Sequence, residues 1–318
     1  MLNNKAWISV VLIIVVSSGL IFYGDSNEVL RHISIFPIKY LMAALTLTSL
    51  NYFLRFLRWE YYLRILKINI PTSESGLIFL SGLVMTLTPS KMGEVLKGYF
   101  LKRRHEIPIS MTAPIVFMER VTDVLAILCL GFIGIQWLPQ PVQVILCASA
   151  FFLLTGWYFA IRYGDRVANI PGIRRWKHLL ETAQQTSYKL NNLKTVLVAT
   201  TLSLLAWTSE GAALWIILLG LEGQISLSGG ITIYSVSTLI GALTTLPGGL
   251  IGTEGTMVTL IHGLGNGKGT AATSTLLVRV VTLWFALLVG IIAILYLSRN
   301  NKPKISRKEI NPNSNPNV

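Results

Sequence analysis

One pattern occurs twice in the apolar part of this chain: a proline interrupts an apolar stretch, a glutamate follows shortly, and an arginine lies inside the next apolar helix. The first copy comprises Pro89, Glu94 and Arg120, and the second comprises Pro247, Glu254 and Arg279. The glutamate and the arginine are 26 residues apart in the first copy and 25 in the second. A lipid bilayer penalises both charge and irregular backbone. We therefore expect a chain that places both at corresponding positions in two halves to build a site there.

The composition is that of an integral membrane protein. Of the 318 residues, 52% are hydrophobic and 13% are charged, and the mean hydropathy is +0.60. A soluble globular domain is far less apolar and carries more charge. The first apolar run, 7–22, is followed by no small-residue cleavage site, so we expect a retained span rather than a signal peptide.

Six apolar runs are long enough to cross about 30 Å of hydrocarbon. They lie near 7–23, 38–57, 111–137, 141–161, 194–219 and 270–297. Two further apolar stretches, 74–103 and 226–265, are each interrupted at the middle, and each limb is short for a crossing. Because proline ends a helix and glycine favours a turn, we expect two re-entrant hairpins; two extra full crossings in each region are the alternative. The expected hairpin tips comprise Pro89, Ser90, Gly93, Pro247, Gly248, Gly249 and Gly252.

The distribution of basic residues orients these spans, because Lys and Arg near span ends accumulate on the cytoplasmic side. Of the 27 Lys and Arg residues, 22 fall in segments that can all be cytoplasmic when six spans leave both termini inside. The first hairpin then opens to the cytoplasm and the second to the outside. Inverted repeats with such broken helices are typical of transporters. The expected location is the cell (inner) membrane.

The predicted fold is thus an all-α integral membrane protein with six spanning helices and two re-entrant helical hairpins in an inverted repeat. One polytopic membrane domain covers 1–298, with repeat halves at about 36–140 and 194–297. Residues 299–318 are rich in Asn and Pro and are expected to form a disordered cytoplasmic tail. The net charge of +13 fits this topology and contact with anionic lipid better than it fits nucleic-acid binding.

Several segments resemble one known family. TPSKMGEVLKGYFLKRR, MERVTDVLA and LPGGLIGTEG follow one another as in the transmembrane region of lysylphosphatidylglycerol synthases and related flippase-like membrane proteins. The resemblance covers about 36–297, most of the chain. Two-domain members carry a soluble acyltransferase-like domain after this region, whereas only a polar tail follows it here. The resemblance therefore implies the lipid-moving part without the part that makes the aminoacyl lipid.

The physical roles of the charged residues can be argued without this resemblance. A carrier for an anionic lipid head needs cationic or amide donors near the bilayer centre. Arg120 and Arg279 each lie about nine residues into a span, which is roughly 13 Å deep at 1.5 Å per residue. A guanidinium can hold phosphate through two hydrogen bonds, and the second limb of each hairpin offers a helix N-terminus. The candidate substrate-binding residues are Lys91, Glu94, Arg120, Asp123, Glu210, Glu254 and Arg279.

The same arginines have structural interpretations, which the sequence leaves open. Arg120 and Asp123 are three residues apart on one helical face and can neutralise each other. Arg279 has no acidic residue within four positions, so Glu254 or Glu210 is its expected partner. Loss of activity on mutation would not separate a structural pair from a substrate contact, because breaking a buried pair costs about 3–5 kcal/mol.

Three other features also have two interpretations. Lys91, at the first tip, either meets a lipid head or extends to the aqueous interface. Glu94 and Glu254 either carry protons in a coupled cycle or pin the hairpin tips, and we favour pinning. The basic and aromatic residues of 55–59 indicate an anchor at a membrane interface, with a role in lipid entry as the minor alternative.

The sequence contains no H-E-x-x-H, G-x-S-x-G, Walker A or paired-cysteine pattern, so we expect no metal or cofactor and favour a transporter over an enzyme. The leading hypothesis is flippase-like translocation of an anionic or amphiphilic lipid, either a phospholipid or a polyprenyl phosphate. The alternatives are a membrane enzyme or accessory factor of lipid-linked glycan or aminoacyl-lipid synthesis, and a scaffold without transport. The oligomeric state stays open, a homodimer included, and no nucleic-acid partner is expected.

Overall fold

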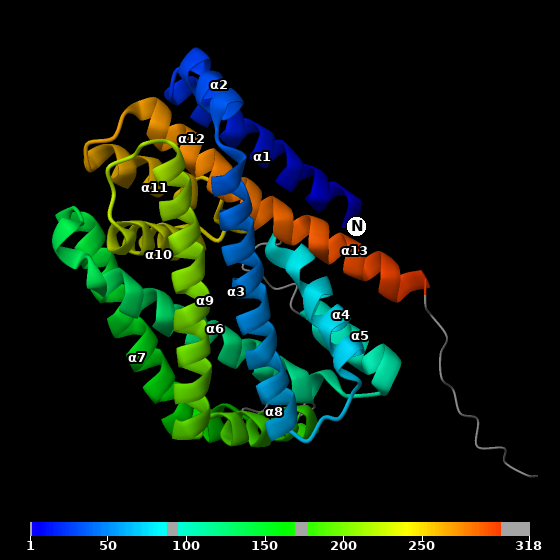
Figure 1. The fold of residues 1–318 in the computed structure, drawn as a ribbon. Helices are drawn as coiled ribbons and strands as arrows, with labels where there is room; N and C mark the ends of the chain where they lie inside the picture. The colour runs from blue at the N-terminus through cyan, green and yellow to red at the C-terminus, as the bar shows by residue number, and fades with distance from the viewer. Residues whose placement is uncertain (1, 88–94, 169–176, 300–318) are drawn as a thin grey trace, which may run out of the picture.

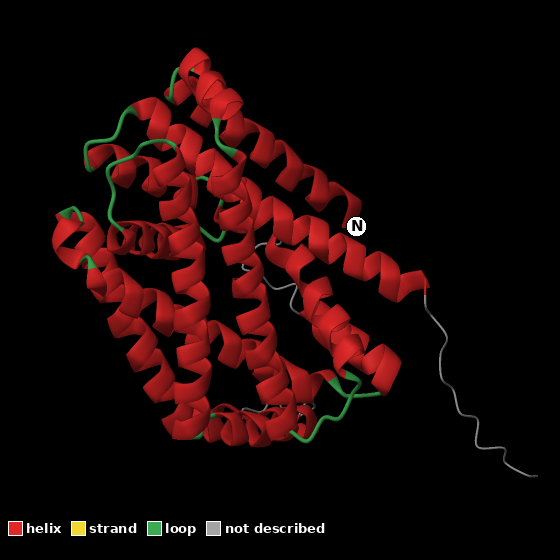
Figure 2. Ribbon diagram, viewed as in Figure 1, coloured by secondary structure: helices red, strands yellow, loops and turns green. Residues whose placement is uncertain are grey.

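The computed structural model describes residues 2–87, 95–168 and 177–299 (Figure 1). These residues form helices joined by short loops, and the described part of the chain contains no strand (Figure 2). The all-α prediction is confirmed for this part. The helices are α1 (Leu2–Tyr23), α2 (Ser26–Ile35), α3 (Ile38–Ile65), α4 (Thr72–Gly82), α5 (Val95–His105), α6 (Ile109–Ile133), α7 (Gln140–Ala168), α8 (Lys177–Leu190), α9 (Leu193–Gly220), α10 (Leu227–Leu243), α11 (Gly252–Gly263), α12 (Lys268–Arg279) and α13 (Phe285–Arg299).

In the described part of the chain, four shorter helical segments lie between them. The 3-10 segments are η1 (Leu83–Leu87), η3 (Ile135–Trp137) and η5 (Pro247–Gly249). The π-helical segment η6 (Val280–Trp284) joins α12 to α13. Segments of these two kinds are usually short and often mark functional sites or hinges.

Each of the six predicted spans contains a helix, namely α1, α3, α6, α7, α9 and the α12–α13 pair. Within the described ranges, two helices are long and apolar enough to cross a membrane, Leu193–Gly220 and Lys268–Arg299. A third crossing results if α2 and α3, which are bent by 85° at their junction, form one span. The middle of α6 carries three charged residues, which lowers its apolar character. The chain is thus a helical membrane protein, and the number six stays a prediction.

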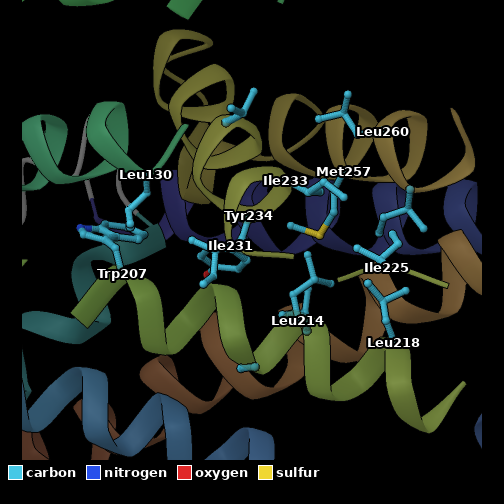
Figure 3. Close-up of a cluster of buried hydrophobic side chains, with 14 of the residues drawn as sticks. Leu130, Trp207, Leu214, Leu218, Ile225, Ile231, Ile233, Tyr234, Met257 and Leu260 are labelled. Atoms are coloured by element: carbon cyan, nitrogen blue, oxygen red, sulfur yellow. The ribbon is translucent and has the colours of Figure 1, made fainter. Parts of the chain in front are cut away.

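The long helices α3 and α9 pack along each other through the centre of the molecule (Figure 1). The amide of Asn51 on α3 donates to the carbonyl oxygen of Ala206 on α9 at 2.8 Å, which gives this buried amide group a partner. Helix α9 is predominantly apolar, and many of its residues are buried against the other helices. Its Trp207 and Leu214 belong to the main hydrophobic cluster, together with Met257 of α11 (Figure 3).

The packing of the shorter helices is reciprocal between the two halves of the chain. Helix α4 packs against α13, and α10 packs against α6, so each interrupted stretch lies against the last long helix of the other half. Helix α5 contacts α6 in the same way that α11 contacts α12. The segments η1 and η5 also contact each other. The two interrupted stretches therefore meet inside the molecule.

The second stretch is interrupted at the expected residues. Helix α10 ends at Leu243, η5 follows, and α11 begins at Gly252. Gly248 and Gly249 have φ angles of 66° and 67°, which glycine adopts without strain. The two limbs contain 17 and 12 residues, so at about 1.5 Å per residue neither spans about 30 Å of hydrocarbon.

The first stretch is described on both sides of its expected break. Helix α4 continues through η1 to Leu87, and α5 begins at Val95. Five residues predicted for the first tip and its site lie outside the described residues: Pro89, Ser90, Lys91, Gly93 and Glu94.

The close approach of α13 to η1 yields a test of the fold. A Cβ atom at Gly290 would lie 2.6 Å from the backbone nitrogen of Val84, so Gly290→Ala must push two backbones apart. We expect a loss of about 1–3 kcal/mol, measured as a lower thermal unfolding midpoint in detergent. Gly156→Ala is the matched control, because no atom lies within 4 Å of a Cβ on this helical glycine. Equal midpoints for the two variants would contradict the packing.

Candidate functional site

A cavity of about 270 Å³ lies between the two halves of the chain. Its wall is formed by α3, α4, η1, α5 and α6 from the first half and by α9–α12, η5, η6 and α13 from the second. Several charged side chains line it, although lipid disfavours charge. The charged residues of the wall are Arg55, Lys97, Arg120, Asp123, Glu210 and Arg279. Four candidates from the sequence, Arg120, Asp123, Glu210 and Arg279, are thus brought to one cavity.

Asp123 is shared by three arginines. Arg58 donates from Nη1 to Oδ1 of Asp123 at 2.6 Å. Nη2 of Arg120 lies 3.3 Å from Oδ2, and Nη2 of Arg55 lies 3.5 Å from the same oxygen. The indole Nε1 of Trp207 donates to Oδ1 at 3.2 Å. Three guanidinium groups thus share one carboxylate in this group of side chains, which we call the Asp123 cluster.

The three arginines of the Asp123 cluster differ in exposure. Only 1% of the Arg58 side chain is exposed, and this side chain also donates to the hydroxyls of Thr122 and Ser203. Arg55 and Arg120 keep 14% and 28% of their side chains exposed and line the cavity. Arg58 therefore belongs to the frame that holds Asp123, whereas Arg55 and Arg120 present positive charge to the cavity.

The expectation that residues 55–59 form an interface anchor is wrong for Arg58 and Trp59, because both residues are fully buried inside the protein. Helix α3 continues to Ile65, well past the predicted span end, so these residues lie within the helix. The Trp59 indole donates to the Ser75 hydroxyl at 3.1 Å. The spacing of Arg55 and Arg58 by three residues, which places them on one helical face, is the sequence signal that could have identified them.

Arg279 connects the second break to the end of α12. Its Nη2 donates to the carbonyl oxygen of Gly248 at 2.6 Å. Its Nε lies 2.6 Å from Oε1 of Glu254, without the alignment of a hydrogen bond. Glu254 is thus the distant partner that the sequence suggested. Because Gly248 lies in the break and Glu254 in the first turn of α11, Arg279 holds both sides of this tip, as expected if Glu254 pins it.

Two other polar contacts lie in or beside the cavity wall. Lys97 forms an ion pair with Glu119 at 2.6 Å, and its ammonium lies 4.5 Å from the centre of the Trp59 ring. The hydroxyl of Tyr234 donates to Oε2 of Glu210 at 2.7 Å. The sequence did not identify Lys97 as a site residue, because its partner is 22 positions away on another helix.

The π-helical segment η6 begins directly after Arg279. The hydroxyl of Tyr52 on α3 donates to the carbonyl oxygen of Thr282 in this segment at 3.0 Å. The Tyr52 ring stacks on Phe285, with ring centres 5.8 Å apart and planes inclined by 18°. Tyr52 therefore joins the first half to the irregular backbone beside Arg279.

The described residues contain no group of three or more His, Cys, Asp or Glu side chains arranged to hold a metal ion. The wall instead combines guanidinium, ammonium and carboxylate groups with hydroxyls and aromatic rings. Guanidinium groups are well suited to phosphate and carboxylate ligands. This donor set is therefore suited to an anionic polar group.

Comparison with known proteins identifies a family. The sequence model of the lysylphosphatidylglycerol synthase TM region matches residues 7–290. A UPF0104 membrane protein of Methanothermobacter thermautotrophicus is 25% identical over 96% of this chain and 100% of its own length. Two UPF0104 membrane proteins of Methanocaldococcus jannaschii are each 24% identical, one over 68% of this chain and 95% of its own, the other over 82% and 85%. Because the family model spans most of the sequence, this chain belongs to the lysylphosphatidylglycerol synthase transmembrane-region family of membrane proteins.

Proposed function

We propose that this protein moves an anionic or amphiphilic lipid between membrane leaflets and holds the lipid head in the cavity between its halves. The Asp123 cluster carries this proposal, because it gathers three guanidinium groups around one carboxylate and presents Arg55 and Arg120 to the cavity. Charged groups inside a membrane protein are costly and often functional, and guanidinium groups can hold a phosphate through bidentate hydrogen bonds. The family description, which names the membrane region of a lipid synthase, supports a lipid substrate.

We also propose that the halves 36–140 and 194–297 are inverted repeats within a membrane domain covering 1–298. The same order of long helix, interrupted pair and long helix in each half supports this proposal. So do the reciprocal contacts of α4 with α13 and of α10 with α6. In transporters of this architecture, the substrate site lies where the broken helices of two repeats meet. The contact between η1 and η5 beside the cavity fits that arrangement.

The proposed location is the cell (inner) membrane, with both termini and the tail 299–318 in the cytoplasm, as the distribution of Lys and Arg favours. The proposed lipid partners are an anionic phospholipid or a polyprenyl phosphate. The re-entrant nature of α10 and α11 is supported by their short limbs and by the Pro247–Gly249 break.

Reconstitution into vesicles tests the proposal. The vesicles contain phosphatidylglycerol with a fluorescent label on an acyl chain. In protein-free vesicles, an added reductant bleaches only the label in the outer leaflet. With the protein present, we expect the bleaching to extend to inner-leaflet lipid, and chromatography of the recovered lipid to show no covalent change. A modified lipid would favour the enzyme alternative, and neither exchange nor modification would favour a scaffold.

The Arg120→Gln variant tests the role of the Asp123 cluster. A hydrogen bond to a charged group contributes about 1.5–3 kcal/mol, so the initial rate of exchange should fall about tenfold or more. Arg103→Gln is the control, because Arg103 is exposed on α5 and contacts Tyr99 instead of the cavity. The proposed role of Arg120 would be wrong if both variants exchanged lipid at the parent rate.

A second set of variants separates the structural role of Arg279 from a transport role. Arg279→Gln leaves Glu254 buried without its cation, so we expect a loss of about 3–5 kcal/mol, measured by thermal unfolding in detergent. The double variant Arg279→Gln with Glu254→Gln should recover most of this stability but still exchange lipid slowly. Recovery of both stability and exchange would show that Arg279 acts only through its ion pair.

A further inference from the structure

Helix α2 lies across the end of α3, at the end of the molecule where α1 ends and α12 begins (Figure 1). The two helices are bent by 85° at their junction. Helix α3 contains 28 residues, so at about 1.5 Å per residue it is longer than the roughly 30 Å of hydrocarbon. If α3 crosses the membrane, α2 therefore lies nearly parallel to the membrane plane.

The sides of α2 differ in chemistry and in exposure. Val29 is fully buried, and the helix packs against α12 and α1. Leu30 and Ile33 are three residues apart on one face, and 58% and 41% of these residues are exposed. The opposite side is polar and exposed, and it comprises Asn27, Arg31 and Ser34. A helix that is divided in this way suits the boundary between lipid heads and acyl chains.

Exposed basic residues gather around α2. They are Arg31 on α2 itself, Lys39 in the first turn of α3 and Lys268 at the first position of α12. The ammonium of Lys268 lies 5.7 Å from the centre of the Tyr23 ring, which places it beside the end of α1. In the proposed orientation these three, of the 27 Lys and Arg residues, lie on the outer side. Because the charge bias disfavours basic residues on that side, their gathering at one helix needs another cause.

The acidic residues beside this helix have electrostatic partners at helix N-termini. Asp25 accepts a hydrogen bond from the backbone N–H of Asn27 at 3.0 Å and caps α2. Glu28 lies against the first turn of α12, because a Cβ atom added at Gly269 would overlap its carboxyl group. A carboxylate at a helix N-terminus is stabilised by the helix dipole. These carboxylates thus hold α2 to α12 and to the preceding turn, while the basic side chains extend outward.

From this arrangement we propose that α2 is an interfacial helix that binds the anionic heads of phospholipids in the outer leaflet. Leu30 and Ile33 contact the upper part of the acyl chains. Arg31, Lys39 and Lys268 contact the phosphates of the surrounding heads, because basic side chains beside a span are attracted to anionic lipid. The inference requires α2 to lie at the membrane surface and does not depend on lipid translocation.

Quenching of a fluorophore on α2 by spin-labelled lipids tests the inference. The fluorophore is attached to Ile35→Cys, at a position that is 69% exposed, after Cys129→Ser and Cys147→Ser remove the native thiols. Nanodiscs of phosphatidylcholine receive increasing fractions of doxyl-labelled phosphatidylglycerol or doxyl-labelled phosphatidylcholine. We expect half-maximal quenching at an about fivefold lower fraction of the anionic lipid, a ratio that corresponds to about 1 kcal/mol for one basic residue.

A second label position is the matched control. Phe152→Cys places the fluorophore on α7 at a residue that is 71% exposed. The surrounding stretch 140–161 contains no Lys or Arg. The two spin-labelled lipids should therefore quench equally at this position.

Charge variants locate the preference at α2. The triple variant Arg31→Gln, Lys39→Gln and Lys268→Gln should bring the quenching ratio at Ile35→Cys close to one. The protein without these three substitutions provides a second measurement, because 1 M salt screens exposed charges and should lower the same ratio.

A comparison variant separates local charge from net charge. Lys102→Gln, Arg103→Gln and Lys189→Gln together remove the same charge from exposed residues of α5 and α8. These helices lie at the opposite end of the molecule from α2 (Figure 1). The quenching ratio on α2 should stay unchanged in this variant; a fall as large as in the first triple variant would show that α2 itself does not select the lipid.

Two other outcomes would also overturn the inference. Equal quenching by both lipids at Ile35→Cys would show that α2 has no preference for an anionic head. Quenching by neither lipid there, with normal quenching at Phe152→Cys, would show that lipid does not reach α2, as when a second copy of the chain covers it. Neither outcome affects the proposed translocation, which the vesicle exchange measures separately.

Discussion

The arrangement of the first half depends on the buried carboxylate of Asp123. It joins Arg55 and Arg58 of α3 to Arg120 of its own helix, α6, and it accepts the indole N–H of Trp207 from α9. Three helices are therefore held at one point by charge-assisted contacts, which are stronger than neutral hydrogen bonds. Each of these charged groups needs a partner once it is buried, because an unpaired charge in a low-dielectric interior costs several kcal/mol. Arg55 and Arg120 also line the cavity, so the interaction that fixes the helices places guanidinium groups in the cavity wall.

The second half uses its arginine differently. Arg279 is matched by one carboxylate, Glu254, and its Nη2 donates to the carbonyl oxygen of Gly248 in the break. This contact neutralises charge and holds irregular backbone, whose polar groups need partners inside a membrane protein. The two halves therefore present corresponding arginines in different surroundings, since Arg120 shares Asp123 with two other arginines whereas Arg279 contacts Glu254. The asymmetry gives the cavity two chemically distinct sides, although the packing of the helices around it is reciprocal.

Much of this fold follows from the sequence, since apolar runs predict helices and Pro247 with two glycines predicts the second break. The Arg279–Glu254 pair could also be predicted, because Arg279 has no acidic residue within four positions in the sequence. The burial of Arg58 was missed because a hydropathy average does not distinguish the two faces of a helix. Helix α3 continues beyond its apolar run, because Arg58 on its polar face bonds side chains of α6 and α9 instead of facing lipid or water. Tertiary contacts determine which residues of such a helix are buried, and a single sequence does not show these contacts.

Several departures from regular helix lie beside the cavity. Thr245 and Ile251 have φ angles of 55° and 68°, which are unfavourable for β-branched residues, and η6 interrupts the α12–α13 helix next to Arg279. The irregular backbone of η6 gains a partner, because the Tyr52 hydroxyl donates to the Thr282 carbonyl oxygen. Strained backbone persists only where its surroundings hold it in place, and it is common at functional sites. Strained backbone, irregular helix and charged side chains coincide at one cavity, whereas α3 and α9 beside it are regular helices. This coincidence supports, independently of any family resemblance, the proposal that the cavity is the functional region.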